Sequence, residues 1–260
     1  MGRLSGQERL EKVRDYVLSA GTVRNEDLAS EFHVSLMTVH RDLDRLAAEG
    51  WLRRVHGGAT VERSVLFESN VKFRSLENAE AKAKIARAAA DLVQPGQAVL
   101  LDDSTTALAV ARELVLRGDP WTAITNANQV VNLVAAQSNA DLIALGGVYY
   151  PSADAFFGAG TVAALSNLYA DIAMMSTSAI TAGDCYHQLQ DSIAIKRAML
   201  ASAERAVMLA DFTKLSKHAL HKFATLAEFA TVVVDDAASS EQISELGEYL
   251  ADVRVAGTVG

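Results

Sequence analysis

The sequence is poor in the features that mark secreted, membrane-spanning and zinc-stabilised proteins. Its one cysteine, Cys185, excludes an internal disulfide framework and leaves no cysteine cluster for structural zinc. No apolar run reaches the roughly 18 residues that span a bilayer, and the opening residues, MGRLSGQERLEK, lack the apolar core of a signal peptide. We therefore expect a cytoplasmic protein with no membrane partner and no bound metal.

The chain also lacks an excess of positive charge, since its net charge is -8 over 260 residues. Residues 1–60 carry 9 Lys+Arg and 9 Asp+Glu and sum to zero, whereas the remaining residues carry 15 against 23. A locally neutral segment with grouped arginines can still bind DNA, because the field at the contact matters more than the total. Composition therefore leaves nucleic-acid binding open, and the length allows a small domain followed by a larger one.

Residues 34–46, VSLMTVHRDLDRL, predict a short amphipathic helix. Ser35 suits its N-cap, and Val39, Leu43 and Leu46 recur at i, i+4 and i+7 to form one apolar stripe. The opposite face carries hydroxyl, imidazole and guanidinium groups, which are suited to base edges and phosphates in a DNA major groove. An ordinary amphipathic surface helix is the alternative, and this segment alone does not exclude it.

The flanking residues favour the DNA-reading interpretation. Residues 5–8, SGQE, have the form of a capping box and start a helix that ends at Gly21, and a second short helix is expected behind an N-cap at Asn25. After Gly50, two β-prone runs around Gly57-Gly58 predict a hairpin, so the whole segment reads as a winged helix-turn-helix. Taken singly, each arginine of the wing reads equally well as part of a solvated strand edge. The residues expected to contact DNA are Ser35, Met37, Thr38, His40, Arg41, Arg45, Arg53, Arg54 and His56.

Residues 27–59, DLASEFHVSLMTVHRDLDRLAAEGWLRRVHGGA, resemble the DNA-binding domain of the DeoR family of bacterial transcription regulators. The resemblance implies a winged helix-turn-helix domain over residues 1–61. His40 stands where the family usually has a second arginine beside Arg41, so the resemblance does not carry the family's operator preference to this chain.

Residues 62–76 mix charges without a clean period and predict a linker. Beyond them an Ala-rich helix is followed by short apolar runs that alternate with helical segments. Strands are expected at 98–102, 122–125, 142–145, 171–175, 207–210 and 232–234, and helices at 108–116, 130–136, 193–200 and 243–250. This alternation predicts an α/β domain over residues 77–257, with a mainly parallel sheet covered on both faces.

Polar residues or glycines follow four of these strands. They are the segments 102–106 (DDSTT), 125–128 (TNAN), 146–147 (GG) and 210–214 (ADFTK). Ligands of parallel sheets bind beyond the carboxyl ends of the strands, where helix N-termini and a lysine suit a phosphate. Each segment alone is more typical of a helix cap, a turn or a solvated lysine, and only their convergence predicts a site.

The larger domain resembles the sensor domain of DeoR-family regulators, whose fold is related to ribose-5-phosphate isomerases and CoA transferases. The family's loops run D-x-G-T-T, T-N, G-G and D-x-[ST]-K, and the resemblance implies a phosphorylated sugar or related metabolite as effector. Ser104 and residues 174–178, MMSTS, depart from the family's glycine-rich pattern, so the effector's identity is not implied. The residues expected to bind the effector are Asp102, Ser104, Thr105, Thr106, Thr125, Asn126, Gly146, Gly147, Asp211 and Lys214.

The competing class is an isomerase-like or CoA-transferase-like enzyme. Asp102, Asp103, Asp184 and Asp211 are possible general bases by type, but residues 183–190 contain no glutamate and no acid-plus-lysine loop is evident. No catalytic triad or cofactor-binding glycine loop is evident either. We therefore expect no enzyme and no cofactor, but a ligand-responsive repressor that binds double-stranded operator DNA as a homo-oligomer, either dimer or tetramer.

Overall fold

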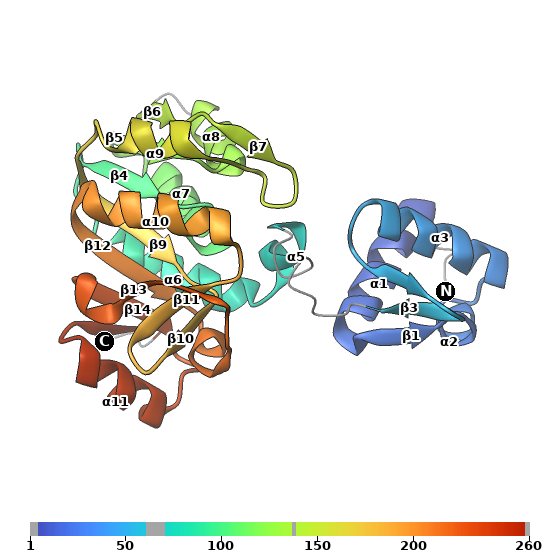
Figure 1. Cartoon of the computed structure of the whole chain (residues 1–260). Coiled ribbons are helices and arrows are strands. Elements are labelled where there is room, and N and C mark those ends of the chain that lie inside the picture. Colours follow the sequence, from blue (N-terminus) through green and yellow to red (C-terminus); the bar gives the residue numbers. More distant parts are fainter. Residues whose placement is uncertain (1–4, 61–70, 137–138, 258–260) are drawn as a thin grey trace. The chain divides into compact units, whose positions relative to one another are not determined.

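The computed structural model describes residues 5–60, 71–136 and 139–257, and the chain divides into two compact units, Met1–Arg74 and Ser75–Gly260 (Figure 1). Within these described ranges, no helix combines the length and the apolar character that crossing a membrane requires.

The N-terminal unit is a three-helix bundle with a small antiparallel sheet of order β1-β3-β2. Its helix α1 begins with the expected capping box, in which Ser5 and Glu8 bond each other's backbone N–H groups, and it ends at Gly21. The elements are α1 (Gly6–Ala20), β1 (Thr22–Arg24), α2 (Asn25–Glu31), α3 (Leu36–Ala48), β2 (Arg53–Val55) and β3 (Gly58–Thr60).

The third strand of this sheet, β1, was not expected from the sequence. It pairs with β3 because Gly58 lets the two backbones approach: a Cβ atom on Gly58 would lie 2.0 Å from the carbonyl oxygen of Val23. Gly58 is therefore the first residue of a strand, and the turn of the predicted hairpin lies at His56-Gly57.

Two other expectations for this region are wrong in detail. Asn25 is the first residue of α2 rather than its cap; the cap is Arg24, whose side chain makes no capping hydrogen bond. Part of the predicted linker is helical, since Val71–Leu76 form α5, and Phe73 on this helix packs against the core of the N-terminal unit. Residues 62–70 lie outside the described residues.

The C-terminal unit alternates strands and helices as the sequence predicts, although the helix at 159–165 and the strand at 253–256 were not expected. Its main elements are α6 (Ala79–Ala90), β4 (Ala98–Leu101), α7 (Thr105–Arg117), β5 (Trp121–Thr125), α8 (Asn128–Ala135), β6 (Ala140–Ala144), α9 (Ala159–Leu165), β9 (Ala170–Ser176), α10 (Gln190–Ala201), β12 (Ala203–Ala210), η1 (Phe212–Ser216), η2 (Leu226–Glu228), β14 (Thr231–Asp235), α11 (Ser240–Tyr249) and β15 (Val253–Ala256). Seven of the strands form one fully parallel sheet of order β15-β14-β12-β9-β4-β5-β6.

Helices cover both faces of this sheet, which confirms the expected α/β class. Along β9 successive side chains enter opposite cores: Ile172 and Met174 pack with α6, α7 and α8, whereas Ala173 and Met175 pack with α9 and α10. Burial on both faces explains why the central strands read as continuous apolar runs. Cys185 lies in the second core, 0% exposed.

Two small antiparallel units were not expected. They are the hairpin of β7 (Val148–Tyr150) with β8 (Ala155–Phe157), and the sheet of β10 (Ala179–Thr181), β11 (Asp184–His187) and β13 (His221–Thr225). The hairpin crosses the end of β5, since Phe156 donates its backbone N–H to the carbonyl of Asn126 at 2.9 Å and Asn128 donates to that of Asp154.

Candidate nucleic-acid interface and effector site

Helix α3 has the start and the two faces that the sequence predicts. The Ser35 hydroxyl accepts from the backbone N–H of Thr38 at 3.2 Å and pairs with its hydroxyl at 2.9 Å, so both side chains are engaged in starting the helix. Val39, Leu43 and Leu46 are at most 1% exposed and form the buried stripe. The opposite face is therefore held outward by a rigid apolar contact.

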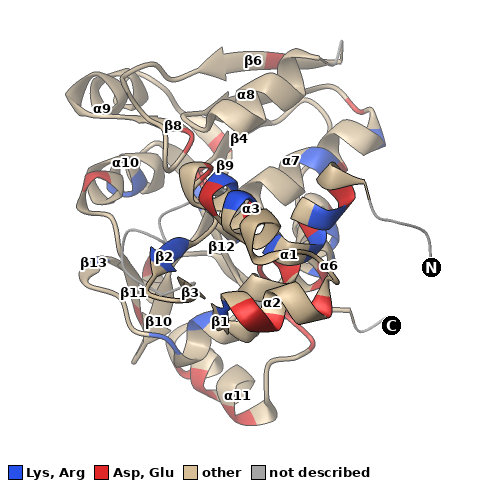
Figure 2. Cartoon of the chain, turned by 90° about the vertical axis from the view of Figure 1, so that its right-hand side faces the viewer, with Lys and Arg blue, Asp and Glu red and all other residues tan. Residues whose placement is uncertain are grey.

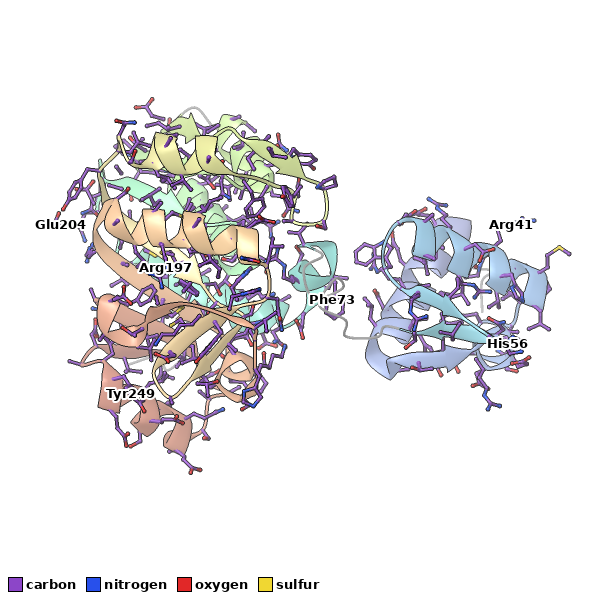
Figure 3. All side chains as sticks on the ribbon, in the orientation of Figure 1. Arg41, His56, Phe73, Arg197, Glu204 and Tyr249 are labelled. Carbon is purple, nitrogen blue, oxygen red and sulfur yellow. The ribbon has the colours of Figure 1, made fainter. Side chains whose placement is uncertain are left out.

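The exposed face of α3 mixes charges of both signs (Figure 2). Met37 is 73% exposed, and Arg41 points outward and forms no ion pair with any residue in the described ranges (Figure 3). Arg45 forms an ion pair, since its Nε lies 3.0 Å from Glu49 one turn along the helix. The Arg45 side chain is 58% exposed, so water screens this pair. Arg41 is thus the most available guanidinium on this face.

A partly buried ion pair that the sequence did not reveal fixes α3 on α1. Asp42, 6% exposed, accepts two hydrogen bonds from Arg9, at 2.6 Å to Nε and 3.1 Å to Nη2. The carboxylate raises the pKa of the Arg9 guanidinium through this hydrogen bond. A bidentate pair of this kind sets the rotation of the helix as well as its position.

The wing presents two of its three predicted DNA contacts to solvent. Arg53 and His56 are exposed, and His56 lies at the hairpin turn (Figure 3). Arg54 was expected to face the DNA backbone as well, but its guanidinium lies against α3, with Nε 3.1 Å from Asp44 and Nη2 2.8 Å from Nδ1 of His40. The structure therefore joins the wing to α3 through Arg54.

In the C-terminal unit, parallel pairing brings the four predicted loops to one edge of the sheet. They follow β4, β5, β6 and β12, of which β4, β5 and β6 are neighbours, while β9 separates β4 from β12. Because the carboxyl ends of all these strands lie at the same edge, the predicted loops share that edge.

Asp102, at the end of β4, is the centre of a closed network. Its carboxylate accepts from the backbone N–H groups of Ser104 at 3.0 Å and Ser176 at 2.8 Å, and from Nζ of Lys196 at 2.5 Å. Lys196 also donates to the carbonyl of Ser176 at 2.9 Å and lies over the ring of Phe223. The network ties β4, β9 and α10 together beneath the loops.

The loop after β4 leads directly into helix α7. Ser104 is its N-cap, with a hydroxyl that accepts from the backbone N–H of Ala107 at 3.0 Å. Thr105 and Thr106 occupy the first turn and are 7% and 3% exposed. A helix N-terminus carries partial positive charge and orients N–H groups outward, which favours an anion in front of it.

The loop after β5 is buried under the β7–β8 hairpin. Thr125 donates its hydroxyl to the carbonyl of Leu101 and accepts from Ala127, so it acts structurally. Asn126 is 0% exposed and donates to the carbonyl of Phe156 at 2.9 Å, but its Oδ1 accepts no hydrogen bond from any described residue. A buried acceptor without a donor is costly and marks a place where a ligand hydroxyl would be stabilising.

The structure gives Gly147 a packing role. A Cβ atom there would lie 2.3 Å from Oγ1 of Thr161 and 2.5 Å from the carbonyl oxygen of Phe157, whereas the space beside Gly146 is open. The absent side chain of Gly147 thus serves the contact with β8 and α9. Only Gly146 has the open space expected of a glycine that a ligand approaches.

The loop after β12 holds a second buried carboxylate. Asp211, 1% exposed, accepts through Oδ1 from Nδ2 of Asn78 at 3.0 Å and from the backbone N–H and the hydroxyl of Thr213. Its Oδ2 accepts no hydrogen bond from the described part of the chain, and Nζ of Lys214 lies 4.0 Å away. A carboxylate oxygen beside a lysine is suited to a ligand that carries both a hydroxyl and a phosphate.

Sequence reasoning missed three residues of this edge, Lys196, Asn78 and Asp235, and named Ser176 only within the segment 174–178 that departs from the family's pattern. Asp235 accepts from the backbone N–H of Phe212 at 2.7 Å and so orients η1. Lys196 reads in the sequence as half of an ordinary Lys-Arg pair on a helix surface. It lies three positions from the apolar Ile193, on the same face of the predicted helix, but a lysine is usually solvated, so its burial was not expected.

Comparison with known proteins covers both units. The family model described as "DeoR C terminal sensor domain" matches residues 77–236, and the one described as "DeoR-like helix-turn-helix domain" matches residues 9–65. The chain is 32% identical over 228 residues to an L-fucose operon activator of Haemophilus influenzae, which covers 87% of this chain and 91% of that protein. It is 29% identical over 249 residues to the lactose phosphotransferase system repressor of Lactococcus lactis, covering 95% and 97%.

Solved structures resemble the chain more distantly. A ribose 5-phosphate isomerase from Methanocaldococcus jannaschii covers 54% of this chain and 55% of its own, with a TM-score of 0.40 and 21% identity. At these values the likeness carries no inference about activity.

Proposed function

The chain belongs to the DeoR family of transcriptional regulators, and we propose that it is the repressor of a sugar-catabolic operon, with operator binding that a phosphorylated sugar or related metabolite modulates. The observation that carries the DNA-binding part is the exposed face of α3. It presents Arg41 outward on a helix that Ser35 caps and a buried apolar stripe anchors. The exposed Arg53 and His56 on the wing support contacts to the DNA backbone.

The effector part rests on the carboxyl edge of the parallel sheet. Asn126 and Asp211 each contribute a buried oxygen that accepts no hydrogen bond from the described residues, and both suit the hydroxyls of a sugar. Lys214 and the N-terminus of α7 at Ser104 supply the positive groups that a phosphate prefers.

For the organisation of the chain, we propose that residues 1–61 bind DNA, residues 62–76 connect, and residues 77–257 bind the effector. Winged helix modules gain specificity by occupying paired half-sites, so the regulator is proposed to act as a dimer or a tetramer. The effector would favour a state with a different spacing of the DNA-binding domains, and this difference in affinity is the coupling between the two sites.

The test is a fluorescence-anisotropy titration of the full chain against the DNA upstream of its own gene, at fixed salt, with and without a panel of sugar phosphates. The proposal expects specific binding that one member of the panel changes. Specific binding that no sugar phosphate of the panel changes would overturn the effector assignment. Ser104→Gly, which introduces the family's residue, would then be the first variant to examine. Absence of specific binding would overturn the proposal that the chain is a DNA-binding regulator. The same sugar phosphates would then be tested as substrates for isomerisation.

A further inference from the structure

Arg54 makes contacts with three different elements of the N-terminal unit. On α3, its Nε lies 3.1 Å from Oδ1 of Asp44 and its Nη2 lies 2.8 Å from Nδ1 of His40, one helical turn away. Its Nη1 donates to Oδ1 of Asn25 on α2 at 3.3 Å and to the carbonyl of Gly58 on β3 at 3.2 Å. All three nitrogens of the guanidinium are engaged, which leaves little donor capacity for a phosphate.

The contact with His40 uses the imidazole as an acceptor. A guanidinium only donates, so Nδ1 of His40 is the accepting atom of this hydrogen bond. A second arginine or a lysine at position 40 would offer no acceptor and would repel Arg54. An imidazole at this position is therefore what allows the wing arginine to turn towards the reading helix.

We propose that Arg54 is a positioning residue that braces α3 against the wing through His40 and Asp44, and does not itself contact DNA. Base edges are read by side chains of α3, and phosphates are held around its margin by groups that tolerate small displacements. Fixing the angle between α3 and the wing therefore raises affinity for the operator but not for random-sequence DNA. Arg54 thereby determines specificity without itself contacting a base or a phosphate.

The inference rests on the proposed operator binding, and the nature of the Arg54 contact separates it from a simple phosphate clamp. A phosphate accepts lysine in place of arginine as a point charge, whereas the forked contacts with Asp44, His40 and Asn25 require the planar guanidinium. Arginine-to-lysine exchange therefore distinguishes the two roles.

The experiment compares Arg54→Lys and Arg54→Gln in the full chain, with operator and random-sequence duplexes titrated at several salt concentrations. Both variants are expected to lose roughly tenfold or more in operator affinity, because they lose the hydrogen bonds within the protein that fix the angle between α3 and the wing. Affinity for random DNA and the dependence of log affinity on log salt should stay as in the native chain. A native-like Arg54→Lys, or an Arg54→Gln whose salt slope falls by about 1, would overturn the proposal.

Arg53→Gln is the matched control, since it removes an exposed arginine from the neighbouring position of the same strand. It should weaken operator and random DNA alike and lower the salt slope by about 1. Should Arg53→Gln instead reproduce the Arg54 pattern, the loss of specificity would be a general effect of altering the wing, and the brace would be refuted.

A readout without DNA keeps the brace distinct from operator binding. A double-mutant cycle of His40→Ala and Arg54→Ala measures unfolding of the N-terminal unit through Trp51, in a Trp121→Phe background where no other tryptophan remains. The two changes should be non-additive, with a coupling of roughly threefold or more in the unfolding equilibrium constant. Additive effects would refute the brace even if the operator is bound, whereas coupling in a chain that binds no operator would refute the proposed function alone.

Discussion

The Nζ atom of Lys196 lies 2.5 Å from Oδ2 of Asp102, and both side chains are 1% exposed. Two charges at this depth are tolerated because each is paired and hydrogen-bonded, Asp102 by the N–H groups of Ser104 and Ser176 and Lys196 by the Ser176 carbonyl. Removal of either partner leaves the other charge buried without a counter-charge. The pair therefore makes the ends of β4 and β9 depend on α10.

We expect Lys196→Met to lower the free energy of unfolding of the C-terminal unit by about 3 kcal/mol, because it strands the Asp102 carboxylate. Urea denaturation in a Trp51→Phe background measures this directly, since Trp121 is then the one tryptophan and belongs to that unit. The double variant Asp102→Asn with Lys196→Met should be more stable than Lys196→Met alone. A double variant that loses as much as the two single changes together would contradict the argument.

Replacement of Arg41 by alanine should weaken operator binding by about 1–3 kcal/mol, since a guanidinium on the reading helix is expected to bond a base edge. Anisotropy titration at fixed salt measures the loss. Arg254→Ala, which removes an arginine from the edge strand β15, is the control and should bind the operator as the native chain does. Unchanged affinity in Arg41→Ala would mean that another residue reads the operator.

Lys214→Ala should reduce the response to the effector roughly tenfold and leave DNA binding unaltered, because a charge-assisted hydrogen bond to phosphate is lost. The measurement is the effector concentration that half-reverses operator binding. Lys84→Ala is a suitable control, since that lysine pairs with Asp236 on the surface of the same unit. An effector response in Lys214→Ala equal to that of the native chain would show that the phosphate binds at another part of the sheet edge.

Gly58→Ala should destabilise the N-terminal unit by more than about 2 kcal/mol, because its methyl group would overlap the Val23 carbonyl and separate β1 from β3. Gly6→Ala, where a Cβ atom meets nothing within 4 Å, should leave stability nearly unchanged. Thermal unfolding followed through Trp51 in the Trp121→Phe background compares the two. Equal melting temperatures would show that the sheet tolerates the separation.

The sequence was informative wherever one physical signal dominated a segment. The stripe of Val39, Leu43 and Leu46 predicted α3 and its buried face because the apolar residues recur at helical spacing over about two turns. The central strands of the parallel sheet were predicted because burial on both faces leaves them uniformly apolar, whereas the edge strand β15, which contains Arg254, was not predicted. Because parallel strands run in the same direction, the four loops that follow them were expected at one edge of the sheet.

What could not be predicted depends on long-range partners. Arg54 reads as a solvated wing arginine until α3 brings His40 and Asp44 beside it, and Lys196 reads as a surface lysine until β4 supplies Asp102. The β7–β8 hairpin and the β10-β11-β13 sheet were not predicted because most of their short strands are only partly buried, and strands such as DCYH and HKFAT mix apolar with polar residues instead of forming a continuous apolar run.

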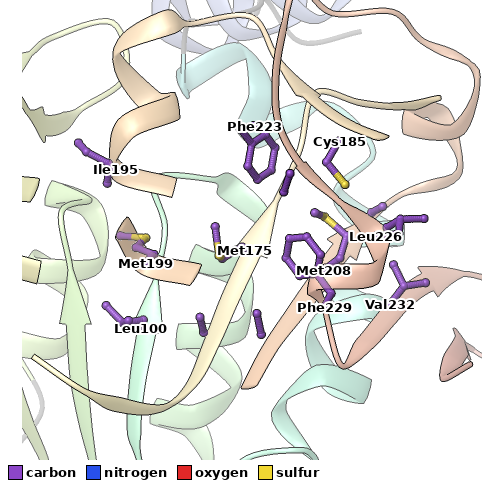
Figure 4. Close-up of a cluster of buried hydrophobic side chains, with 14 of the residues drawn as sticks. Leu100, Met175, Cys185, Ile195, Met199, Met208, Phe223, Leu226, Phe229 and Val232 are labelled. Atoms are coloured by element: carbon purple, nitrogen blue, oxygen red, sulfur yellow. The ribbon is translucent and has the colours of Figure 1, made fainter. Parts of the chain in front are cut away.

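The thiol of Cys185 lies in the core near Phe223 and Leu226 (Figure 4), and burial raises its pKa to about 12. Only the thiolate attacks electrophiles, so this cysteine stays inert near neutral pH while the unit is folded. A cysteine placed at a surface position, such as Leu116→Cys on α7 where the native side chain is 78% exposed, would be the single reactive thiol of the chain. Maleimide dyes and spin labels can therefore be attached at chosen positions without removing the native cysteine.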